Sequence, residues 1–314
     1  MHTDQPSQPS SEGGQQPSVV AAHDVLPLDE QAALHQRRRL LQSRVVPWLH
    51  EEVASRMAER LQAIKRVPAH VLNSSPALGG GHAQLLAAYP DAQHWWWEAS
   101  PALRAQTELP LAPGWWARWR GASTAHWRNP ASPAAELLWS NMELHWCALQ
   151  GQRMKQWQEA VAVGGFVMFS TIGPDSFKEL RQLWQERGWG AVAPDWVDMH
   201  DLGDAMVRAG FEDPVMDQEA IRLTWSRPEG LLRDLRALGG NTAPARSAGL
   251  RTPRWRDMVL QALEQLRGGD GRLALTLEVV YGHAFKGQPR LTVAAETAVS
   301  LEHMRSMVRR TTPR

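Results

Sequence analysis

The sequence predicts an α/β fold in which a mostly parallel sheet is packed between helices and ends in an antiparallel edge. Two patterns support this fold class. Between residues 70 and 209, short apolar runs typical of buried strands alternate with amphipathic helical patterns. In the last third, strand-like runs at 215–225 and 273–281 flank two Arg-rich helical segments, which indicates a late, hairpin-like pair of strands. No internal repeat is visible in the chain.

The N-terminal part is predicted to hold a leader and helices. Residues 1–24 are rich in Gln, Ser, Pro and Gly and bury too little apolar area to offset chain entropy, which predicts a disordered leader. Residues 25–66 carry two helical patterns. The first is heavily charged and includes the run Arg37–Arg39, which is typical of a solvated face. The second has an apolar stripe on one side, formed by Leu49, Val53, Met57, Leu61 and Ile64.

A βαβ unit is predicted next. A strand from His70, the triplet Gly79–Gly81, a helix over 83–89 and a strand over 93–97 form this unit, which is parallel and right-handed by default. Glycines in such a turn let a ligand approach the backbone, and Glu98 stands where such folds keep an acid for ribose hydroxyls. An ordinary loop and an unrelated acid are the alternative. The candidate cofactor-binding residues are Asn73, Gly79, Gly80 and Glu98.

The remaining elements complete a domain over 67–290, with a helical insertion at about 226–268 and a tail at 291–314. Residues 107–134 show no clean period. Beyond them, strand-like patterns lie at 137–139 and 166–169. Helical patterns lie at 154–163, 176–186, 201–209, 228–238 and 254–266.

Further polar residues follow predicted strands, at the edge where open α/β sheets bind ligands. Asn141 can bind a ligand amide or carboxylate, or else bond its own backbone in a turn. Ser170 and Thr171 offer hydroxyls to a ligand carboxylate, with helix capping as the alternative role of their turn. His200 lies between acids and suits acid/base or orienting work; alternatively, Asp201 caps the helix and His200 packs outside it. Asn141 is thus a candidate cofactor-binding residue, and the other candidates are catalytic.

Charge is balanced overall but segregated along the chain. The 34 Lys and Arg residues against 33 Asp and Glu leave no global field for nucleic acid or an anionic membrane. Residues 195–219 nevertheless hold eight acids and one base, and residues 222–256 hold eight Arg and two acids. This basic face predicts an acidic or phosphate-bearing protein partner, and a solvated face paired with the acidic segment is the alternative. The candidate partner-binding residues are Arg233, Arg236 and Arg254.

Several other function classes are disfavoured. Cys147 is the only cysteine, which excludes internal disulfides and thiolate clusters, and His145 lacks partners at metal-ligand spacing, so we expect no metal. No apolar run approaches the roughly 18 residues of a membrane span, and the N-terminus lacks the apolar core of a signal peptide. We therefore expect a cytoplasmic protein that binds neither nucleic acid nor membrane.

Six segments between Trp48 and Lys286 carry a family resemblance in combination. They are 52–61 (EVASRMAERL), 138–147 (LWSNMELHWC), 164–180 (GGFVMFSTIGPDSFKEL), 198–217 (DMHDLGDAMVRAGFEDPVMD), 231–236 (LLRDLR) and 278–283 (EVVYGH). With these segments the chain resembles the BioC-type malonyl-acyl-carrier-protein O-methyltransferases of biotin synthesis, which have the class I S-adenosylmethionine-dependent methyltransferase fold.

The resemblance implies a doubly wound, seven-stranded, Rossmann-like sheet whose last strand is antiparallel. It also implies a reaction, in which S-adenosylmethionine (SAM) donates a methyl group to the free carboxylate of a malonyl thioester on acyl carrier protein. The basic face would then meet that acidic protein. Because a carboxylate is already ionised at neutral pH, the reaction needs positioning and exclusion of water rather than a strong base.

The chain departs from the family pattern where the cofactor is expected. The family has an acid followed by a G-x-G-x-G turn, whereas here Asn73 replaces the acid, and Ser75 and Ala77 replace two of the three glycines. Glu98 preserves the second motif, but Ala122–Ser123 stands in place of the acid that contacts adenine. Two interpretations stay open: an active methyltransferase with a remodelled turn, or a catalytically inactive relative that acts as a binding or regulatory protein.

Overall fold

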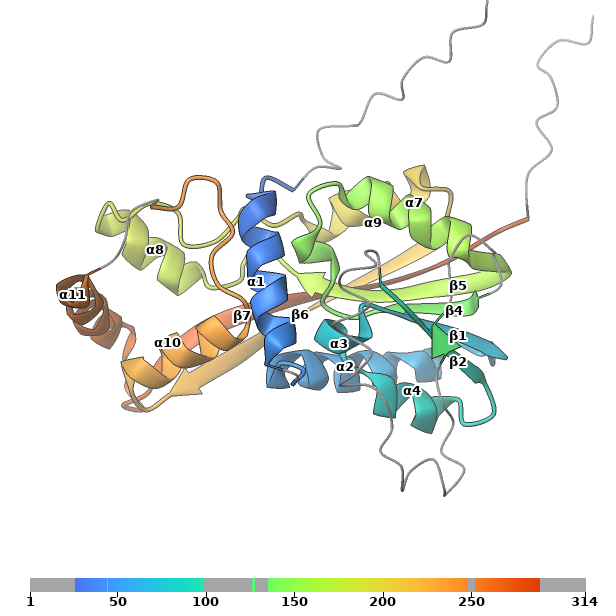
Figure 1. The fold of residues 1–314 in the computed structure, drawn as a ribbon, viewed down its shortest axis with the longest axis horizontal. Coiled ribbons are helices and arrows are strands. Elements are labelled where there is room, and N and C mark those ends of the chain that lie inside the picture. The colour runs from blue at the N-terminus through green and yellow to red at the C-terminus, as the bar shows by residue number, and fades with distance from the viewer. Residues whose placement is uncertain (1–25, 44, 99–125, 128–134, 248–251, 289–314) are drawn as a thin grey trace, which may run out of the picture.

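The structure is a computed structural model that describes residues 26–43, 45–98, 126–127, 135–247 and 252–288 (Figure 1). A seven-stranded sheet runs through the molecule, with helices on both faces. The predicted leader, the predicted tail and Ala122–Ser123 lie outside the described residues. The strands are β1 (His70–Ser74), β2 (Gln93–Trp97), β3 (His126–Trp127), β4 (Ala135–Ser140), β5 (Val161–Ile172), β6 (Glu212–Trp225) and β7 (Leu273–Phe285).

Nine α-helices are found among the described residues, and all the predicted helices are among them. They are α1 (Glu30–Gln42), α2 (Trp48–Arg60), α3 (Pro76–Gly79), α4 (His82–Ala88), α7 (Gln150–Ala160), α8 (Lys178–Glu186), α9 (Met199–Arg208), α10 (Pro228–Ala237) and α11 (Pro253–Leu263). Short 3₁₀ turns follow at 61–63, 144–146 and 264–266. The sequence patterns did not predict α3, which occupies the expected glycine-rich turn.

The strand order is β3-β2-β1-β4-β5-β7-β6. The first five strands in this order pair in parallel, and β7 runs antiparallel to both β5 and β6. This topology confirms the predicted α/β class, the seven-stranded sheet and the late antiparallel pair. The antiparallel strand lies one place inside the edge, because β7 inserts between β5 and β6. Strand order reverses between β1 and β4, which makes their carboxyl ends the expected ligand-binding edge.

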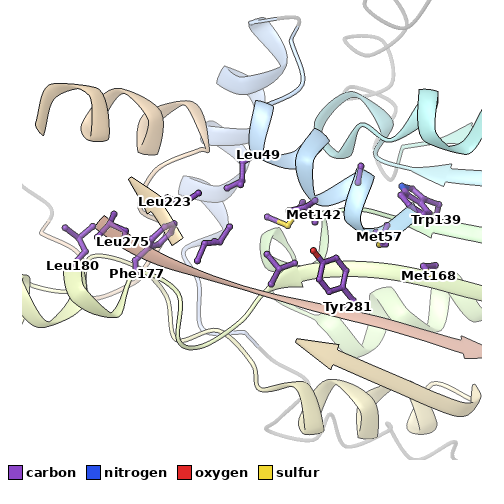
Figure 2. Packing of buried hydrophobic residues seen from close by; sticks show 14 of the residues in the cluster. Leu49, Met57, Trp139, Met142, Met168, Phe177, Leu180, Leu223, Leu275 and Tyr281 are labelled. Atoms are coloured by element: carbon purple, nitrogen blue, oxygen red, sulfur yellow. The ribbon is translucent and has the colours of Figure 1, made fainter. Parts of the chain in front are cut away.

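The central strands are buried on both faces, so their sequences read as continuous apolar runs rather than alternating ones. Leu137 and Leu138 of β4 are both fully buried although they point to opposite faces. On one face, the predicted stripe of α2 packs over β4 and β5, with Met57 near Trp139 and Met168 (Figure 2). Burying each such side chain contributes about 1.5–3 kcal/mol.

The opposite face of the sheet is covered by α7 and α9. Their apolar side chains, including Met154, Trp157, Leu202 and Met206, pack in a second core cluster with Leu138. The helices α7 and α9 therefore form one outer layer, and α2 and α4 form the other, as the doubly wound arrangement requires.

Strands β6 and β7 extend beyond the rest of the sheet, and their far ends lie among α8, α10 and α11 (Figure 1). Apolar residues of this region, such as Leu180, Leu231, Val259 and Leu275, continue the first core cluster. The indole Nε1 of Trp225 donates to Asp234 Oδ2 at 2.8 Å, which fixes α10 against the end of β6.

Helix α1 connects this helical region to the centre of the sheet. Its Leu40 and Leu41 belong to a small cluster with Leu78 of α3. At its C-terminal end, Arg39 donates to the carbonyl oxygens of Arg236 and Gly239, at 2.6 and 2.9 Å, and so caps the end of α10. The interpretation of the Arg37–Arg39 run as a solvated face was therefore wrong for Arg39, because the contact depends on a helix about 200 residues away in the chain.

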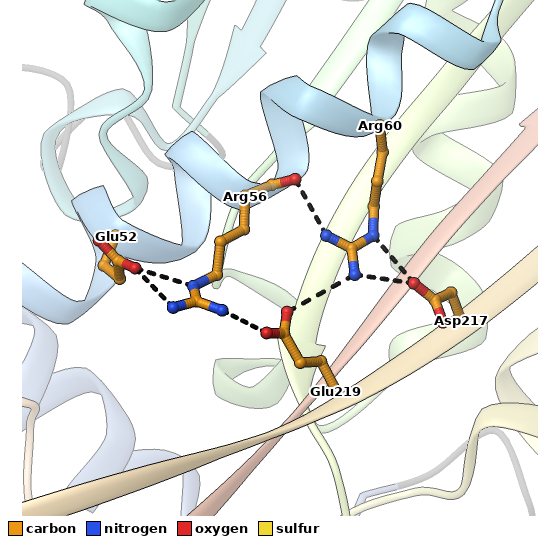
Figure 3. Close-up of polar contacts among 5 residues, drawn as sticks. All are labelled: Glu52, Arg56, Arg60, Asp217 and Glu219. Carbon is orange, nitrogen blue, oxygen red and sulfur yellow. Dashed lines mark hydrogen bonds and ion pairs between the residues drawn. The ribbon is translucent and has the colours of Figure 1, made fainter.

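An ion network ties α2 to β6 (Figure 3). Arg60 contacts Asp217 through two nitrogens at 2.8–2.9 Å and Glu219 at 3.6 Å, and Arg56 pairs with the other oxygen of Glu219. The Arg60 guanidinium also lies 3.7 Å from the centre of the Tyr281 ring. These contacts join the N-terminal helices to the edge strand.

We predict that Arg60→Ala lowers the free energy of unfolding by about 1–2 kcal/mol, because it removes both the ion network and the ring contact. The matched control is Glu52→Ala, which removes only the local pair with Arg56 and should cost less than about 0.5 kcal/mol. Urea unfolding curves measure both values. A loss of stability in Arg60→Ala no larger than that in Glu52→Ala would contradict a stabilising role of the ion network.

Candidate functional site

A buried carboxylate lies at the carboxyl ends of β1 and β4. Glu143, which follows β4, accepts hydrogen bonds from Ser74 and Ser140 at 2.7 Å and from Ser75 at 2.9 Å, and it pairs with Arg153 of α7. Ser74 and Ser140 are register neighbours in the sheet, so their hydroxyls reach the same oxygen. Glu143 and Arg153 are only 2% and 5% exposed.

The environment of Glu143 keeps it ionised. Burial by itself would raise the pKa of this carboxyl, but the charge of Arg153 and the hydrogen bonds from Ser74 and Arg153 outweigh burial and lower the pKa to about 2. A charged group therefore sits at the ligand-binding edge at every physiological pH.

The predicted glycine-rich turn is a short, buried helix. Ser75 adopts a left-handed conformation with φ of 52° and leads directly into α3. A Cβ atom on Gly79 would lie 2.5 Å from the carbonyl oxygen of Asn141, so this glycine is required by the chain's own backbone. Gly80, with φ of 71°, then turns the chain towards α4.

Asn141 is a hub of internal hydrogen bonds. Its Nδ2 donates to the carbonyl oxygen of His50 at 2.7 Å and to that of Gly79. Its Oδ1 accepts from Ser170 Oγ at 2.6 Å. The side chain thereby joins α2, α3 and β5 at the end of β4. The structure places it at the predicted edge, and its role towards a cofactor stays a prediction.

The other predicted cofactor residues also reach this edge. Asn73, at 2% exposure, donates from Nδ2 to the carbonyl oxygen of Gly80 at 3.1 Å. Glu98 follows β2 and is 9% exposed. The hydroxyl of Ser75 lies 3.4 Å from Glu98 Oε2 and 2.9 Å from Glu143 Oε1, so the two acids face one serine.

The three predicted catalytic residues do not gather in one place. Ser170 and Thr171 are buried at the end of β5, where Ser170 also accepts from the backbone of Met142 at 3.1 Å. The His200 side chain is 80% exposed on α9, with Nδ1 2.7 Å from Asp198 Oδ1. Asp198 caps α9, so the alternative in which Asp201 caps this helix was wrong. The catalytic roles of these residues stay predictions.

A large cavity opens beside this edge, between α1 and the helical region. Its volume is about 1150 Å³, and most of its wall is apolar or aromatic. The wall includes Met142, Ile172, Phe177, Leu180, Trp184, Trp196, Leu232, Leu235, Trp255, Val259 and Leu277. Such a cavity suits the apolar part of an extended ligand.

Arginines also line this cavity, namely Arg39, Arg233, Arg236 and Arg256. Among the described residues that line it, Glu229 is the one acid. Burial, followed by the nearby charge of Arg236, lowers the pKa of Arg39. Two of the three predicted partner residues, Arg233 and Arg236, thus reach the cavity, whereas Arg254 is exposed on α11 and is not part of its lining.

Two buried histidines complete the cavity wall nearest the sheet. His50 Nδ1 lies 2.7 Å from the carbonyl oxygen of Leu78, and its ring meets that of His145 edge-on, 6.2 Å away. Burial lowers the pKa of His50 to about 4, and burial followed by the nearness of His50 lowers the pKa of His145. Both imidazoles are neutral at physiological pH.

Sequence reasoning missed Glu143, Arg153 and Arg39. Glu143 lies in a segment that was recognised as a strand end, and an acid at that position was the available signal. Arg153 lies on a helix face among apolar residues, where a charged residue is rarely expected unless paired. Nothing in the local pattern points to its partner, because the pairing depends on how α7 packs beside β4.

Comparison with known proteins identifies the family. The chain is 37% identical over 270 residues to the malonyl-acyl-carrier-protein O-methyltransferase of Laribacter hongkongensis, covering 83% of this chain and 88% of that protein. Proteins of the same name from Gallionella capsiferriformans and Nitrosospira multiformis are 36% identical over 77% and 78% of this chain, and over 86% and 85% of their own lengths. The chain belongs to the malonyl-acyl-carrier-protein O-methyltransferase family.

No protein-family model matches the chain. The crystal structure of the YcgJ protein from Bacillus subtilis superposes with a TM-score of 0.47 and 11% identity, covering 76% of this chain and 99% of that one. Within the described ranges, no helix has the length and apolar character needed to cross a membrane. Nor do three or more His, Cys, Asp or Glu side chains gather there as metal ligands.

We predict that stability falls as the pH drops from about 6.5 to about 4, by up to about 3 kcal/mol from His50 alone. The unfolded chain takes up this proton near the ordinary histidine pKa, whereas folded His50 resists protonation, so acid favours the unfolded state. Urea unfolding at about pH 7.5 and about pH 5 measures the effect. His50→Gln should weaken the dependence without abolishing it, because burial also lowers the pKa of His82 and His145. An equal pH dependence in wild type and His50→Gln would contradict it.

Proposed function

We propose that the protein is a SAM-dependent malonyl-acyl-carrier-protein O-methyltransferase that methylates the free carboxylate of a malonyl thioester, the family's step in biotin biosynthesis. The observation that carries this proposal is the 37% identity to an enzyme of that name over 88% of its length. The class I strand order and the cavity at the carboxyl edge of the sheet agree with it. We place the reaction in the cytoplasm, the compartment that the sequence predicts.

The large cavity suits a malonyl thioester on a phosphopantetheine arm. That substrate carries negative charge at its carboxylate and at the phosphodiester that joins the arm to the carrier protein. Arg39, Arg233 and Arg236 supply positive charge around the cavity, and aromatic walls suit the uncharged middle of the arm. The same arginines and the exposed Arg254 would meet the acidic carrier protein.

The reaction requires correct positioning of the substrate carboxylate rather than a general base. The malonyl carboxylate is ionised at neutral pH and is already the nucleophile. Its oxygen must be held in line with the methyl group and shielded from water. The neutral His50 and His145 and the apolar walls leave the arginines as the groups that attract and orient that carboxylate.

The residues at the strand ends fit SAM by the chemistry of their donor set. SAM supplies an electrophilic methyl group on a sulfonium, and it presents ribose hydroxyls at one end and an ammonium and a carboxylate at the other. Glu98 would hold the ribose hydroxyls. Beside it, Glu143 and Arg153 offer buried charge of both signs.

A catalytically inactive relative remains the second candidate, because one observation favours it. The amides of Asn73 and Asn141 bond the chain itself, and the turn after β1 is a helix packed under α1. Such a protein would still bind the acyl carrier protein through the basic face and would act as a binding or regulatory protein.

The test is to incubate the protein with malonyl-acyl carrier protein and SAM and to follow the carrier protein by mass spectrometry. We expect a mass gain of one methyl group and formation of S-adenosylhomocysteine. A carrier protein that binds but gains no mass would overturn the enzyme proposal in favour of the inactive relative.

We further predict that the double reversal Arg233→Glu with Arg236→Glu raises the apparent KM for malonyl-acyl carrier protein about tenfold or more, because charge steers and holds the acidic partner. The matched control is the double reversal Lys155→Glu with Arg187→Glu, because both residues are exposed and lie outside the basic face and the cavity wall. Steady-state kinetics at two salt concentrations provide the measurement. An unchanged KM in the double variant would argue against this docking face.

A further inference from the structure

The pair formed by Glu143 and Arg153 is placed where a ligand binds. Taking two charges out of water is costly, and such a pair often stabilises a fold less than apolar residues would. Here the pair sits at the carboxyl ends of β1 and β4, the edge at which open α/β sheets bind their ligands. Both side chains are at least nine-tenths buried.

Arg153 also faces a second cavity. This space of about 490 Å³ lies between α1 and α7 and is lined by Arg153, Arg37 and Gln156, among others. The Nε atoms of Arg153 and Arg37 are buried and have no hydrogen-bond partner among the described residues. The charge of Arg37 adds to the effect of Arg153 in lowering the pKa of Glu143. Each of these two cavity-lining arginines therefore holds one buried donor without an acceptor.

We propose that Glu143 and Arg153 bind the amino-acid end of SAM, an inference that rests on the proposed function. Glu143 accepts hydrogen bonds from the ligand ammonium. Arg153, together with Arg37, donates to the ligand carboxylate. Without ligand, the two protein groups pair with each other, and the zwitterion replaces each partner by a group of the same charge.

The surroundings allow this exchange. When Arg153 turns to the ligand, Glu143 keeps the three hydroxyl donors of Ser74, Ser75 and Ser140 and so remains ionised and fixed. Arg153 keeps its bond to Gln156 Oε1 at 3.0 Å and its contact with the Trp97 ring at 4.4 Å.

The order of the two acids along the site also matches the order of the ribose and the ammonium along the ligand. Ser75 bridges Glu143 and Glu98, at 2.9 and 3.4 Å, so an acid for the ribose and an acid for the ammonium lie on either side of one hydroxyl. The negative charge that Asn73 does not supply at the end of β1 is thereby supplied from the end of β4.

Isothermal titration of two ligands tests the assignment. S-adenosylhomocysteine has the amino-acid end, and 5′-methylthioadenosine lacks it while keeping the nucleoside. We expect Glu143→Gln to weaken S-adenosylhomocysteine binding about tenfold or more and to change 5′-methylthioadenosine binding less than about twofold. Arg153→Lys keeps the charge but loses the planar guanidinium. It should also weaken S-adenosylhomocysteine binding selectively, by a smaller factor. The exposed Arg187→Lys is the control for Arg153→Lys and should change neither affinity.

The outcomes separate the inference from the function. Equal losses for both ligands in Glu143→Gln, or no loss for either, would overturn the inference while leaving the enzyme proposal in place. Failure of the wild type to bind either ligand would overturn the proposed function instead. Circular dichroism and urea unfolding establish that each variant is folded; if Glu143→Gln is not, the selective loss in Arg153→Lys decides.

Discussion

The buried carboxylate of Glu143 joins β1, β4 and α7 at the carboxyl edge of the sheet. Its hydrogen bonds come from the end of β1, from the turn after β1 and from the end of β4, and its ion pair comes from α7. A charge left without these partners in the interior would cost several kcal/mol, so the elements that supply them are held in one arrangement. Hydrogen bonds and an ion pair fix the carboxyl edge of the sheet, whereas apolar packing fixes the rest of the core.

Helix α1 connects this edge with the large cavity. Its apolar face covers α3, and Arg39 at its end caps α10 beside the large cavity. Asp29 at its beginning pairs with Arg246 at 2.7 Å, so both ends of the helix are tied to the chain that follows β6. The carboxyl edge of the sheet and the large cavity therefore share α1 as a wall, and this is where we propose that SAM and the acyl substrate meet.

Much of the fold follows from periodicity. The stripe from Leu49 to Ile64 and the buried runs of β1 and β4 were read correctly, because apolar spacing is a local property. The order of β6 and β7 in the sheet, the helix α3 and the strand β3 were not, since they depend on pairing and packing with distant segments. Asn73, Glu98 and Asn141 were predicted at the carboxyl edge of the sheet, where the structure places them, and their role towards a cofactor stays a prediction. The ion pair between Glu143 and Arg153 was not predicted, because it depends on how α7 packs beside β4 and has no local sequence signal.

A crystal structure of the protein bound to S-adenosylhomocysteine would show directly whether Glu143 and Arg153 hold the amino-acid end of the ligand. We predict that the ligand ammonium lies within hydrogen-bonding distance of Glu143 and that Arg153 has turned from Glu143 to the ligand carboxylate. An intact pair between Glu143 and Arg153 with the amino-acid end bound elsewhere would contradict it.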